Sequence, residues 1–326
     1  YDISKKRVNS LKKAIIPFHE PGLDTLVLNK SNDKKLNFTN SIDACLKFSD
    51  VYFICVGTPQ KTNGQPNLEF IKSSIQSISD YVDLQIKNKK NLSKKHIFIK
   101  STVPPGTIKK LSRKLKSRKL DSFITISSNP EFLKEGSAIQ DFMKPDRVVV
   151  GSNYQDAVEV IRHLHRPILW KSDRLLTVSP ESSETIKYSS NAFLATKISF
   201  INEIANLCEK TNVDIKDISL GMGSDQRIGD RFLRAGPAYG GSCFPKDTKA
   251  IVSTAEKFKT NLSIIKSVIK SNYKRSDLLS KRINLILKNK IKNKVVSFLG
   301  VTFKANTDDM RDSSSLKLIP FLSKKG

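Results

Sequence analysis

Short apolar runs alternate with longer amphipathic stretches along the first half of the chain. Runs rich in Val, Ile and Phe occur at residues 51–56, 96–100, 123–126 and 147–150. A nearly continuous apolar run of this length is typical of a strand buried on both faces of a parallel sheet. Residues 68–87 and 108–118 have the pattern of helices. This alternation predicts an α/β fold with a Rossmann-like, doubly wound parallel sheet.

Polar side chains follow three of the predicted strands. Thr58, Thr102 and Glu131 come shortly after the first, second and third apolar runs. In open α/β sheets, ligands bind outside the carboxyl ends of the strands. We therefore expect these three side chains to line one crevice.

The pattern changes near residue 180. Residues 181–210 read as one long helix, for which Ser179 or Ser182 can serve as N-cap. Within it, Lys187 and Asn191 are four residues apart and therefore share a face.

A second helical block is predicted over residues 248–290, then a strand at 295–300 and a helix from about 313–315. We therefore expect three parts: a Rossmann-like domain over 1–178, a long central helical domain over 179–290, and the start of a second α/β domain over 291–326. The first part has no G-x-G-x-x-G motif, so we expect a longer polypeptide trimmed at both ends.

Composition narrows the class of protein. The 326 residues carry a formal net charge of +26, with lysine runs scattered among Asn and Ser. A nucleic-acid footprint gathers basic residues on one face with aromatic side chains between them. We therefore interpret the lysines as solvated and expect no nucleic-acid partner. An apolar run of about 18 residues is lacking, which argues against a membrane span.

The cysteines and histidines argue against a disulfide framework and a metal site. Cys45, Cys55, Cys208 and Cys243 lie far apart, without a CxxC pair, which suits reduced thiols in a cytoplasmic protein. The four histidines do not cluster with them, so we expect no metal.

Residues 239–247, YGGSCFPKD, carry the strongest chemical signal. Two glycines precede Cys243, and Lys246 and Asp247 follow within a turn. Glycines allow a backbone and a ligand to approach closely, and a thiol beside a cation is biased toward the nucleophilic thiolate. A small buried cysteine after a turn is the alternative interpretation of these residues alone.

Further motifs extend the signal over the whole chain. They are EPGL at 20–23, CVGTP at 55–59, KSTVPPGT at 100–107, NPEFLKEG at 129–136, PDR at 145–147, KYSSNAF at 187–193, QRIG at 226–229, GGSCFPKD at 240–247 and GVTFKANTDDMR at 300–311. Each is weak alone. Together, in this order, they resemble the nucleotide-sugar 6-dehydrogenases of the UDP-glucose/GDP-mannose dehydrogenase family.

The resemblance implies oxidation of the C6 primary alcohol of a nucleotide sugar to a carboxylate, with two NAD+ and no metal. UDP-glucose is the expected substrate and UDP-glucuronate the product. GDP-mannose and N-acetylated UDP-sugars are alternatives, but the N-acetylmannosamine branch usually has histidine where this chain has Ser242. A basic nucleic-acid-binding protein and an inactive scaffold are alternatives of other classes.

The resemblance also implies catalytic roles. Cys243 matches the nucleophile that forms a thiohemiacetal and then a thioester. Lys187 resembles the lysine that stabilises an oxyanion, and Asn191 the amide that holds the reacting oxygen or a water. Asp247 resembles a carboxylate that handles a proton or positions water. Glu131 matches a general base that acts through water together with Thr102.

Binding residues are implied in the same way. Asp2 matches an acidic residue that binds the adenosine ribose, which favours NAD over NADP. Further cofactor positions are Arg7, Thr58, Thr102, Glu135, Lys246 and Arg311. Substrate positions are Phe132, Leu133, Lys187, Asn191, Arg227, Phe232, Arg234, Tyr239, Gly240, Phe303 and Lys304. The equivalent of Arg227 reaches into a neighbouring subunit, so a homodimer or higher homo-oligomer is expected, whereas Arg311 could equally form a surface ion pair.

Overall fold

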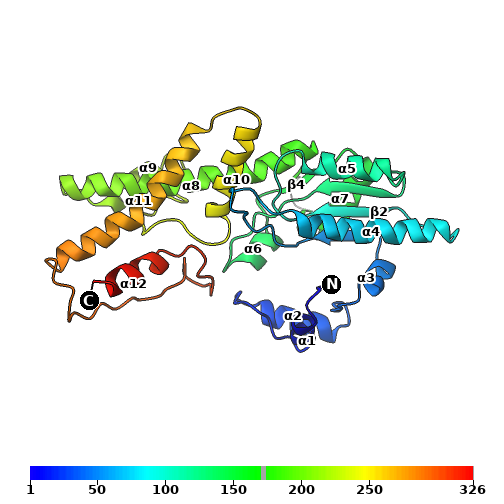
Figure 1. The fold of residues 1–326 in the computed structure, drawn as a ribbon, viewed down its shortest axis with the longest axis horizontal. Coiled ribbons are helices and arrows are strands. Elements are labelled where there is room, and N and C mark those ends of the chain that lie inside the picture. The colour runs from blue at the N-terminus through cyan, green and yellow to red at the C-terminus, as the bar shows by residue number, and fades with distance from the viewer. Residues whose placement is uncertain (170–173, 326) are drawn as a thin grey trace. The chain divides into compact units, whose positions relative to one another are not determined.

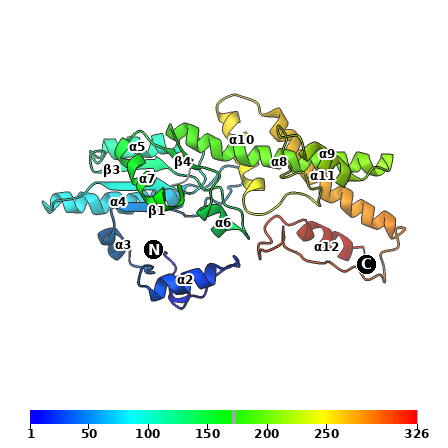
Figure 2. The ribbon, with the colours of Figure 1, turned by 180° about the vertical axis from the view of Figure 1, so that it is seen from behind.

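The structure, a computed structural model, describes residues 1–169 and 174–325. The chain divides into two units, seen from opposite sides in Figures 1 and 2. The first unit comprises Tyr1–Lys61 and Pro66–Lys187, and the second Thr62–Gln65 and Tyr188–Gly326.

The first unit contains one sheet whose strands lie in chain order. The strands are β1 (Val51–Ile54), β2 (Lys95–Ile99), β3 (Ile124–Ser128), β4 (Val148–Gly151) and β5 (Leu175–Val178). The predicted strands are confirmed as β1–β4, and β5 was not predicted. Strands β1, β2 and β3 are parallel to one another, and so are β4 and β5, as expected. Between these groups β3 and β4 meet antiparallel, through the pair Ser128 and Gly151.

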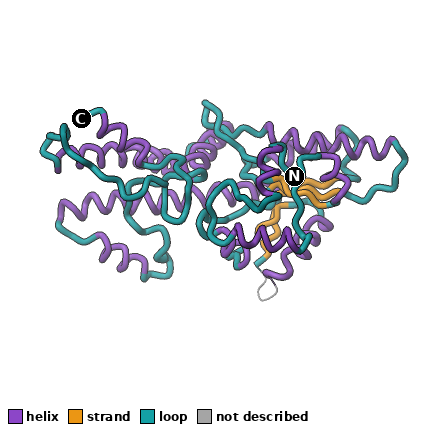
Figure 3. Tube along the Cα trace, turned by 90° about the horizontal axis from the view of Figure 1, so that it is seen from below, coloured by secondary structure: helices purple, strands orange, loops and turns teal. Residues whose placement is uncertain are grey.

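Helices cover both faces of this sheet (Figure 3). Ile97 and Ile99 of β2 belong to a core shared with α4 (Glu69–Lys87) and α5 (Thr107–Ser117). Phe98, which points to the other face because side chains alternate along a strand, packs in a second core with α7 (Gln155–Leu169). The doubly wound α/β fold is confirmed.

Strand β1 is buried on one face only, which corrects the expectation from its apolar run. Tyr52 and Ile54 are buried, whereas Phe53 is 40% exposed. In the described sheet β1 is one of the two edge strands, and Phe53 stacks on Phe98 with 5.4 Å between ring centroids.

Short helices flank the sheet. The helices α1 (Lys5–Leu11), α2 (Leu23–Asn32) and α3 (Ile42–Phe48) precede it, and α6 (Ala138–Met143) follows the loop after β3. The hydroxyls of Ser4 and Ser41 accept hydrogen bonds from backbone N–H groups in the first turns of α1 and α3, which are ordinary N-caps.

The predicted long helix is confirmed as α8 (Pro180–Thr211). Ser179 caps its start, since its hydroxyl accepts from the Ser182 N–H at 3.1 Å. Gly151, at the end of β4, lets the helix start pack against the sheet, because a Cβ there would lie 2.4 Å from the Ser183 Cβ. The helix begins in the first unit and ends in the second.

The second unit is helical. It contains most of α8 together with α9 (Ile215–Gly223), α10 (Phe244–Lys257), α11 (Ser263–Ile286) and α12 (Ser315–Ser323). The single helical block expected over 248–290 is therefore two helices. The chain turns between them, where Lys259 adopts a positive φ of 55°. Among the described residues, none of the helices combines the length and apolarity needed to cross a bilayer.

The strand expected at 295–300 was a wrong prediction. These residues form an irregular segment in which Val295 is 95% exposed. An apolar run becomes a strand only where another strand pairs with its backbone, and in the described parts of the chain no strand pairs with this run.

Candidate active site

Cys243 lies at the N-cap of α10 and is half-buried. Its Sγ is 3.5 Å from the Ser242 Oγ. A helix N-terminus carries partial positive charge, which stabilises an anion such as a thiolate. This placement supports the nucleophile interpretation rather than that of a structural cysteine in an apolar core.

Gly240 and Gly241, which precede Cys243, allow another segment of the protein to pack closely against them. We had expected them to allow the close approach of a ligand. A Cβ on Gly240 would lie 2.4 Å from the Asp312 carbonyl oxygen, and one on Gly241 would lie 2.8 Å from the Phe303 ring. The Gly241 N–H also donates to the Arg311 carbonyl at 2.8 Å. The segment 303–312 is therefore packed against the loop that carries the thiol.

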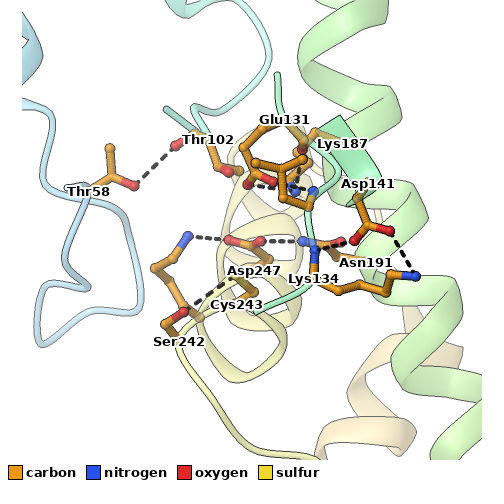
Figure 4. Close-up of polar contacts among 12 residues, drawn as sticks. Thr58, Thr102, Glu131, Lys134, Asp141, Lys187, Asn191, Ser242, Cys243 and Asp247 are labelled. Carbon is orange, nitrogen blue, oxygen red and sulfur yellow. Dashed lines mark hydrogen bonds and ion pairs between the residues drawn. The ribbon is translucent and has the colours of Figure 1, made fainter. Parts of the chain in front are cut away.

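Asp247 is fully buried in the first turn of α10. Asn191 Nδ2 donates to its Oδ2 at 2.6 Å, and the Lys246 ammonium pairs with its Oδ1, as Figure 4 shows. A buried carboxylate is tolerated when its oxygens are paired in this way. The contacts join three predicted site residues and distinguish Asp247 from a solvated helix-terminal charge.

Lys187 is buried and bound to the loop after β3. Its Nζ donates to the Glu131 carbonyl at 2.6 Å and pairs with Glu131 Oε1 at 3.0 Å. Lys187 is therefore a fixed cation, and the alternative of a solvated helix lysine is wrong.

A second lysine, Lys100, lies nearby, and its Nζ donates to Asn129 Oδ1 at 3.2 Å. Burial lowers the pKa of Lys100, although Glu131 opposes that shift.

Phe132 contacts two cations. The Arg147 guanidinium lies 3.8 Å and the Lys187 Nζ 5.2 Å from its ring centroid, distances typical of cation–π contacts. The ring therefore helps to orient Lys187. The neighbouring Leu133, 37% exposed, donates its N–H to Glu131 Oε2 at 2.7 Å.

Thr58 and Thr102 come together at the carboxyl ends of β1 and β2. Thr58 is buried, and its Oγ1 donates to the Thr102 carbonyl at 3.2 Å (Figure 4). Glu131 follows β3, the next parallel strand. The three loops therefore lie at one edge of the sheet, and that they line one crevice stays a prediction.

The residues near the N-terminus fit a dinucleotide by their chemistry. Asp2 pairs with Arg7 at 2.7 Å and accepts from the Ser4 N–H at 2.8 Å. Burial alone would raise the pKa of Asp2, but these two partners outweigh it and hold the pKa below its usual value. An ionised carboxylate accepts hydrogen bonds from ribose hydroxyls.

The loop after β1 has open space beside Thr58, because a Cβ on Gly57 would meet nothing within 4 Å.

The predicted arginines lie at the surface. Arg227 is 89% exposed and pairs with Asp225 at 2.6 Å. Arg311 pairs with Asp309 at 2.8 Å. This is the surface ion pair that was the alternative prediction for Arg311. Arg234 is exposed. Their functional roles stay predictions.

Other predicted substrate residues surround Phe244 or Phe303 in the second unit. Phe232 and Tyr239 each meet the Phe244 ring edge-on, with 6.1 Å between centroids. Burial raises the pKa of Tyr239 to about 12, so its hydroxyl is neutral at ordinary pH. Lys304 Nζ lies 5.7 Å from the Phe303 ring centroid. In the first unit, Glu135 is half-buried in the loop after β3.

Sequence reasoning missed the residues that hold the loop before Cys243. The Asn272 side chain accepts from the Tyr239 N–H at 2.8 Å and donates to its carbonyl at 3.0 Å. Asn202 accepts from the Gly236 N–H at 2.8 Å, and Arg275 donates to the Gly236 carbonyl at 3.1 Å. Polar residues on buried helix faces were the available signal, but their partners are distant in sequence.

Two buried carboxylates were also missed as site residues. Glu184, near the start of α8, accepts from the N–H groups of Gly106 at 2.6 Å and Ile108 at 2.8 Å. Glu20 accepts from the N–H groups of Gly136 at 2.7 Å and Ala138 at 2.8 Å. Glu20 stands in the EPGL motif, but nothing in that motif indicates its partners.

We expect Glu184 to make stability depend on pH. Burial raises the pKa of Glu184 from 4.5 to about 7, against the opposing effect of the Ile108 and Gly106 N–H groups. The folded state therefore favours the neutral acid, and its stabilising contribution is full below pH 4.5 and lost as the pH rises through about 7. Relative to Glu184→Gln, the wild-type free energy of unfolding should fall by up to roughly 3 kcal/mol between pH 4 and 8.

Chemical denaturation of both proteins over that pH range measures this difference. Any constant cost of the glutamine cancels, because only the change with pH is compared. Parallel curves for the two proteins would contradict the shifted pKa.

No three His, Cys, Asp or Glu side chains within the described residues gather where a metal ion could be held.

Comparison with known proteins identifies the family. Residues 1–169 match the NAD binding domain of the UDP-glucose/GDP-mannose dehydrogenase family, and residues 181–274 match its central domain. A UDP-glucose 6-dehydrogenase of Rickettsia typhi is 41% identical over 325 residues, which span 100% of this chain and 72% of the relative. One of Rhizobium meliloti is 40% identical over 329 residues, which span 100% and 73%.

A solved structure shares the fold. The UDP-glucose dehydrogenase of the archaeon Pyrobaculum islandicum superposes with a TM-score of 0.92 at 31% identity, over 100% of this chain and 73% of that one. The cofactor that the sequence predicted, NAD, is confirmed by the matched domain. The chain therefore belongs to the UDP-glucose/GDP-mannose dehydrogenase family and is an NAD-dependent dehydrogenase.

Proposed function

We propose that the protein oxidises UDP-glucose to UDP-glucuronate through a covalent adduct on Cys243. The observation that carries this proposal is the thiol at the start of α10, one turn before a fully buried Asp247 that is bonded to Asn191. An alcohol oxidation alone needs no nucleophile. A thiol that captures the aldehyde allows the second oxidation to follow without release.

NAD, when bound, accepts a hydride ion from the sugar carbon in each of the two oxidations. We propose that Asp2 and Arg7 hold its adenosine ribose. The other cofactor contacts in this proposal are Thr58, Thr102, Glu135, Lys246 and Arg311. The charged Asp2 and the paired threonines after β1 and β2 support it.

The first oxidation also requires removal of the proton from O6. We assign this proton to Glu131, which receives it through a water held with Thr102. Lys187, paired with Glu131 at 3.0 Å, keeps the carboxylate in place beside the start of α8.

The thiolate of Cys243 then attacks C6 of the aldehyde. A C–S bond forms, the carbonyl π bond breaks and its electron pair goes to O6. Lys187 and Asn191 stabilise this oxyanion, in the way that fixed donors act at developing negative charge. The two side chains lie one turn apart on α8. Glu131 then returns its proton to O6 through the same water, which completes the thiohemiacetal.

Loss of a second hydride from C6, which the second NAD+ would accept, and of the O6 proton, which Glu131 takes and passes to solvent, gives a thioester. Water adds to its carbonyl carbon, the C–S bond breaks, and the carboxylate leaves with Cys243 restored as thiolate. We assign the placement of this water to Asp247, with Glu131 accepting a proton. One water is consumed and two NADH are formed for each sugar.

The full-length enzyme tests the proposal directly. With UDP-glucose and excess NAD+, NADH formed per sugar consumed should equal two, and the product should be the carboxylate. One NADH per sugar, with free aldehyde as product, would overturn the covalent step.

We propose UDP-glucose rather than GDP-mannose or an N-acetylated UDP-sugar because the full-length relatives described above are UDP-glucose 6-dehydrogenases. The contacts in this proposal are Phe132, Leu133, Lys187, Asn191, Arg227, Phe232, Arg234, Tyr239, Gly240, Phe303 and Lys304. We expect kcat/KM to favour UDP-glucose by about 100-fold or more, a ratio that one or two altered contacts in a binding pocket can produce. Equal kcat/KM values for the three sugars would contradict this choice.

We also propose that residues 1–178 bind NAD, that 179–290 supply catalytic residues and subunit contacts, and that 291–326 begin a UDP-binding domain.

A homodimer through α8 and α9 forms part of the proposal. Phe193, Phe200 and Leu207 are seven residues apart on α8 and so share one face, yet they are 65%, 46% and 58% exposed. Leu220 of α9 is 74% exposed. A second copy of the chain would bury such a stripe, and it would bring the exposed Arg227 to a neighbouring subunit.

Replacing Phe200 with aspartate should convert the dimer to monomer, because a charge in a buried interface is left unpaired. Sedimentation velocity at micromolar concentration measures the change. Phe48→Asp is the matched control, since Phe48 on α3 is 85% exposed and lies outside the stripe. A dimer that persists in Phe200→Asp would exclude this surface.

A further inference from the structure

Two loops of the first unit are each held by a clamp, in which one buried glutamate accepts hydrogen bonds from two backbone N–H groups. Glu184 binds the backbone N–H groups of Gly106 and Ile108, and Glu20 binds those of Gly136 and Ala138, all at 2.6–2.8 Å. In each clamp one buried carboxylate takes the amides of residues two apart, at the start of a helix. The first of the two is a glycine with a φ of 84° at Gly106 and 83° at Gly136.

Each clamped loop carries a proposed reacting group. The loop between β2 and α5 contains Thr102 and ends at Gly106, and the loop between β3 and α6 contains Glu131 and ends near Gly136. Glu184 thereby ties the Thr102 loop to α8, one turn before Lys187. Lys187 in turn binds the Glu131 carbonyl and carboxylate, so that both loops are tied to one helix.

The Glu131 loop is held at a second point. Glu20 precedes α2 and lies 116 residues from Gly136 in sequence. Lys187 holds the beginning of this loop and Glu20 holds its end. A carboxylate, the form that Glu184 takes above about pH 7, suits the task because it offers acceptors on both oxygens and no donor. Helix N-termini present unsatisfied N–H groups to it.

We propose that Glu184 and Glu20 are positioning residues that fix Thr102 and Glu131 relative to Lys187. The inference rests on the proposed function, because it takes these three residues to act on the sugar. Neither carboxylate touches the substrate in this assignment. Each acts through the backbone of a loop, and its loss displaces the reacting groups without removing them.

The test uses Glu184→Gln and Glu20→Gln in the full-length enzyme. Glutamine has nearly the same size, but it replaces one acceptor oxygen with an NH2 group that faces a backbone N–H. We expect kcat for each variant to fall about 100-fold, the effect of misplacing reacting groups by about 1 Å. KM for UDP-glucose and for NAD+ should change by less than about threefold, because the binding contacts remain.

Glu181→Gln is the matched control. Glu181 lies one turn before the Glu184 position on α8 and is only half-buried, so the control removes the same charge from the same helix and should keep wild-type kcat. All rates are taken per titrated Cys243 thiol, well below each variant's melting temperature. A merely structural role would leave kcat per folded site unchanged under those conditions, and that result would overturn the inference.

Hydrogen exchange of the wild-type enzyme gives a second readout that needs no variant. The amides of residues 106, 108, 136 and 138 should exchange as slowly as those of β2 and β3. Fast exchange at these amides would also overturn the inference, even if the variants did not fold. A wild-type enzyme that forms one NADH per sugar would instead refute the proposed function and leave the clamps as structural contacts.

Discussion

Replacing Cys243 with serine is expected to stop turnover after the first oxidation. The hydroxyl keeps the size of the side chain, but it is a far weaker nucleophile than a thiolate at neutral pH. The steady-state rate of NADH formation should fall by roughly six orders of magnitude, the scale seen when a covalent nucleophile is lost. Rapid mixing with UDP-glucose should show at most one NADH per site, followed by trapped aldehyde or adduct.

Cys45→Ser controls for the loss of a thiol. Cys45 lies on α3 and is half-buried, like Cys243, but it has no proposed role. Its variant should keep two NADH per sugar at the wild-type rate. Wild-type turnover by Cys243→Ser would remove the covalent step and leave Asp247 or a water as the only agent for the second oxidation.

The fold was predictable where local pattern and tertiary environment agree. The long helix α8 could be predicted nearly to the residue, because a capping serine precedes an uninterrupted helical stretch. Strands β2, β3 and β4 each contain at least two buried Ile or Val residues and were equally clear. Strand β5 was missed because its sequence, Leu-Leu-Thr-Val, is only four residues long and is interrupted by Thr177.

Pairing partners could not be read from local pattern. Residues 295–300 have the composition of a strand, yet a strand exists only through its neighbours. The antiparallel contact of Ser128 with Gly151 depends on how residues 129–147 return to the sheet. Neither outcome is encoded in the residues of the strand itself.

The grouping of candidate residues on single helices was predictable from their spacing, whereas their chemical roles came from the family resemblance and stay predictions. Lys187 and Asn191 were placed on one face of α8, and Asp247 one turn after Cys243, by helical periodicity alone. The hydrogen bonds that hold the loops in place were not predictable, because they join residues far apart in the chain. Glu184 accepts from the Gly106 N–H, 78 residues away in sequence, and Glu20 from the Gly136 N–H, 116 residues away. A single sequence shows only a glutamate and a distant glycine, with nothing to connect them.

Replacing Lys187 with alanine is expected to have the second largest effect on activity. The substitution removes the buried cation that we assign to the O6 oxyanion, and it leaves Glu131 without its 3.0 Å partner. A preorganised donor at a developing oxyanion contributes about 100- to 1000-fold to kcat. We therefore expect kcat to fall by about that factor.

Added ethylamine should restore part of the Lys187→Ala rate, because it can supply an ammonium group in the space that the lysine vacates. Lys210→Ala is the matched control, since Lys210 lies exposed in the last turn of the same helix and should keep the wild-type rate. If kcat of Lys187→Ala stays within a few-fold of wild type, charge stabilisation must come from elsewhere. In that case the ion pair with Glu131 serves only to anchor the loop, which separates the electrostatic role of this lysine from its structural one.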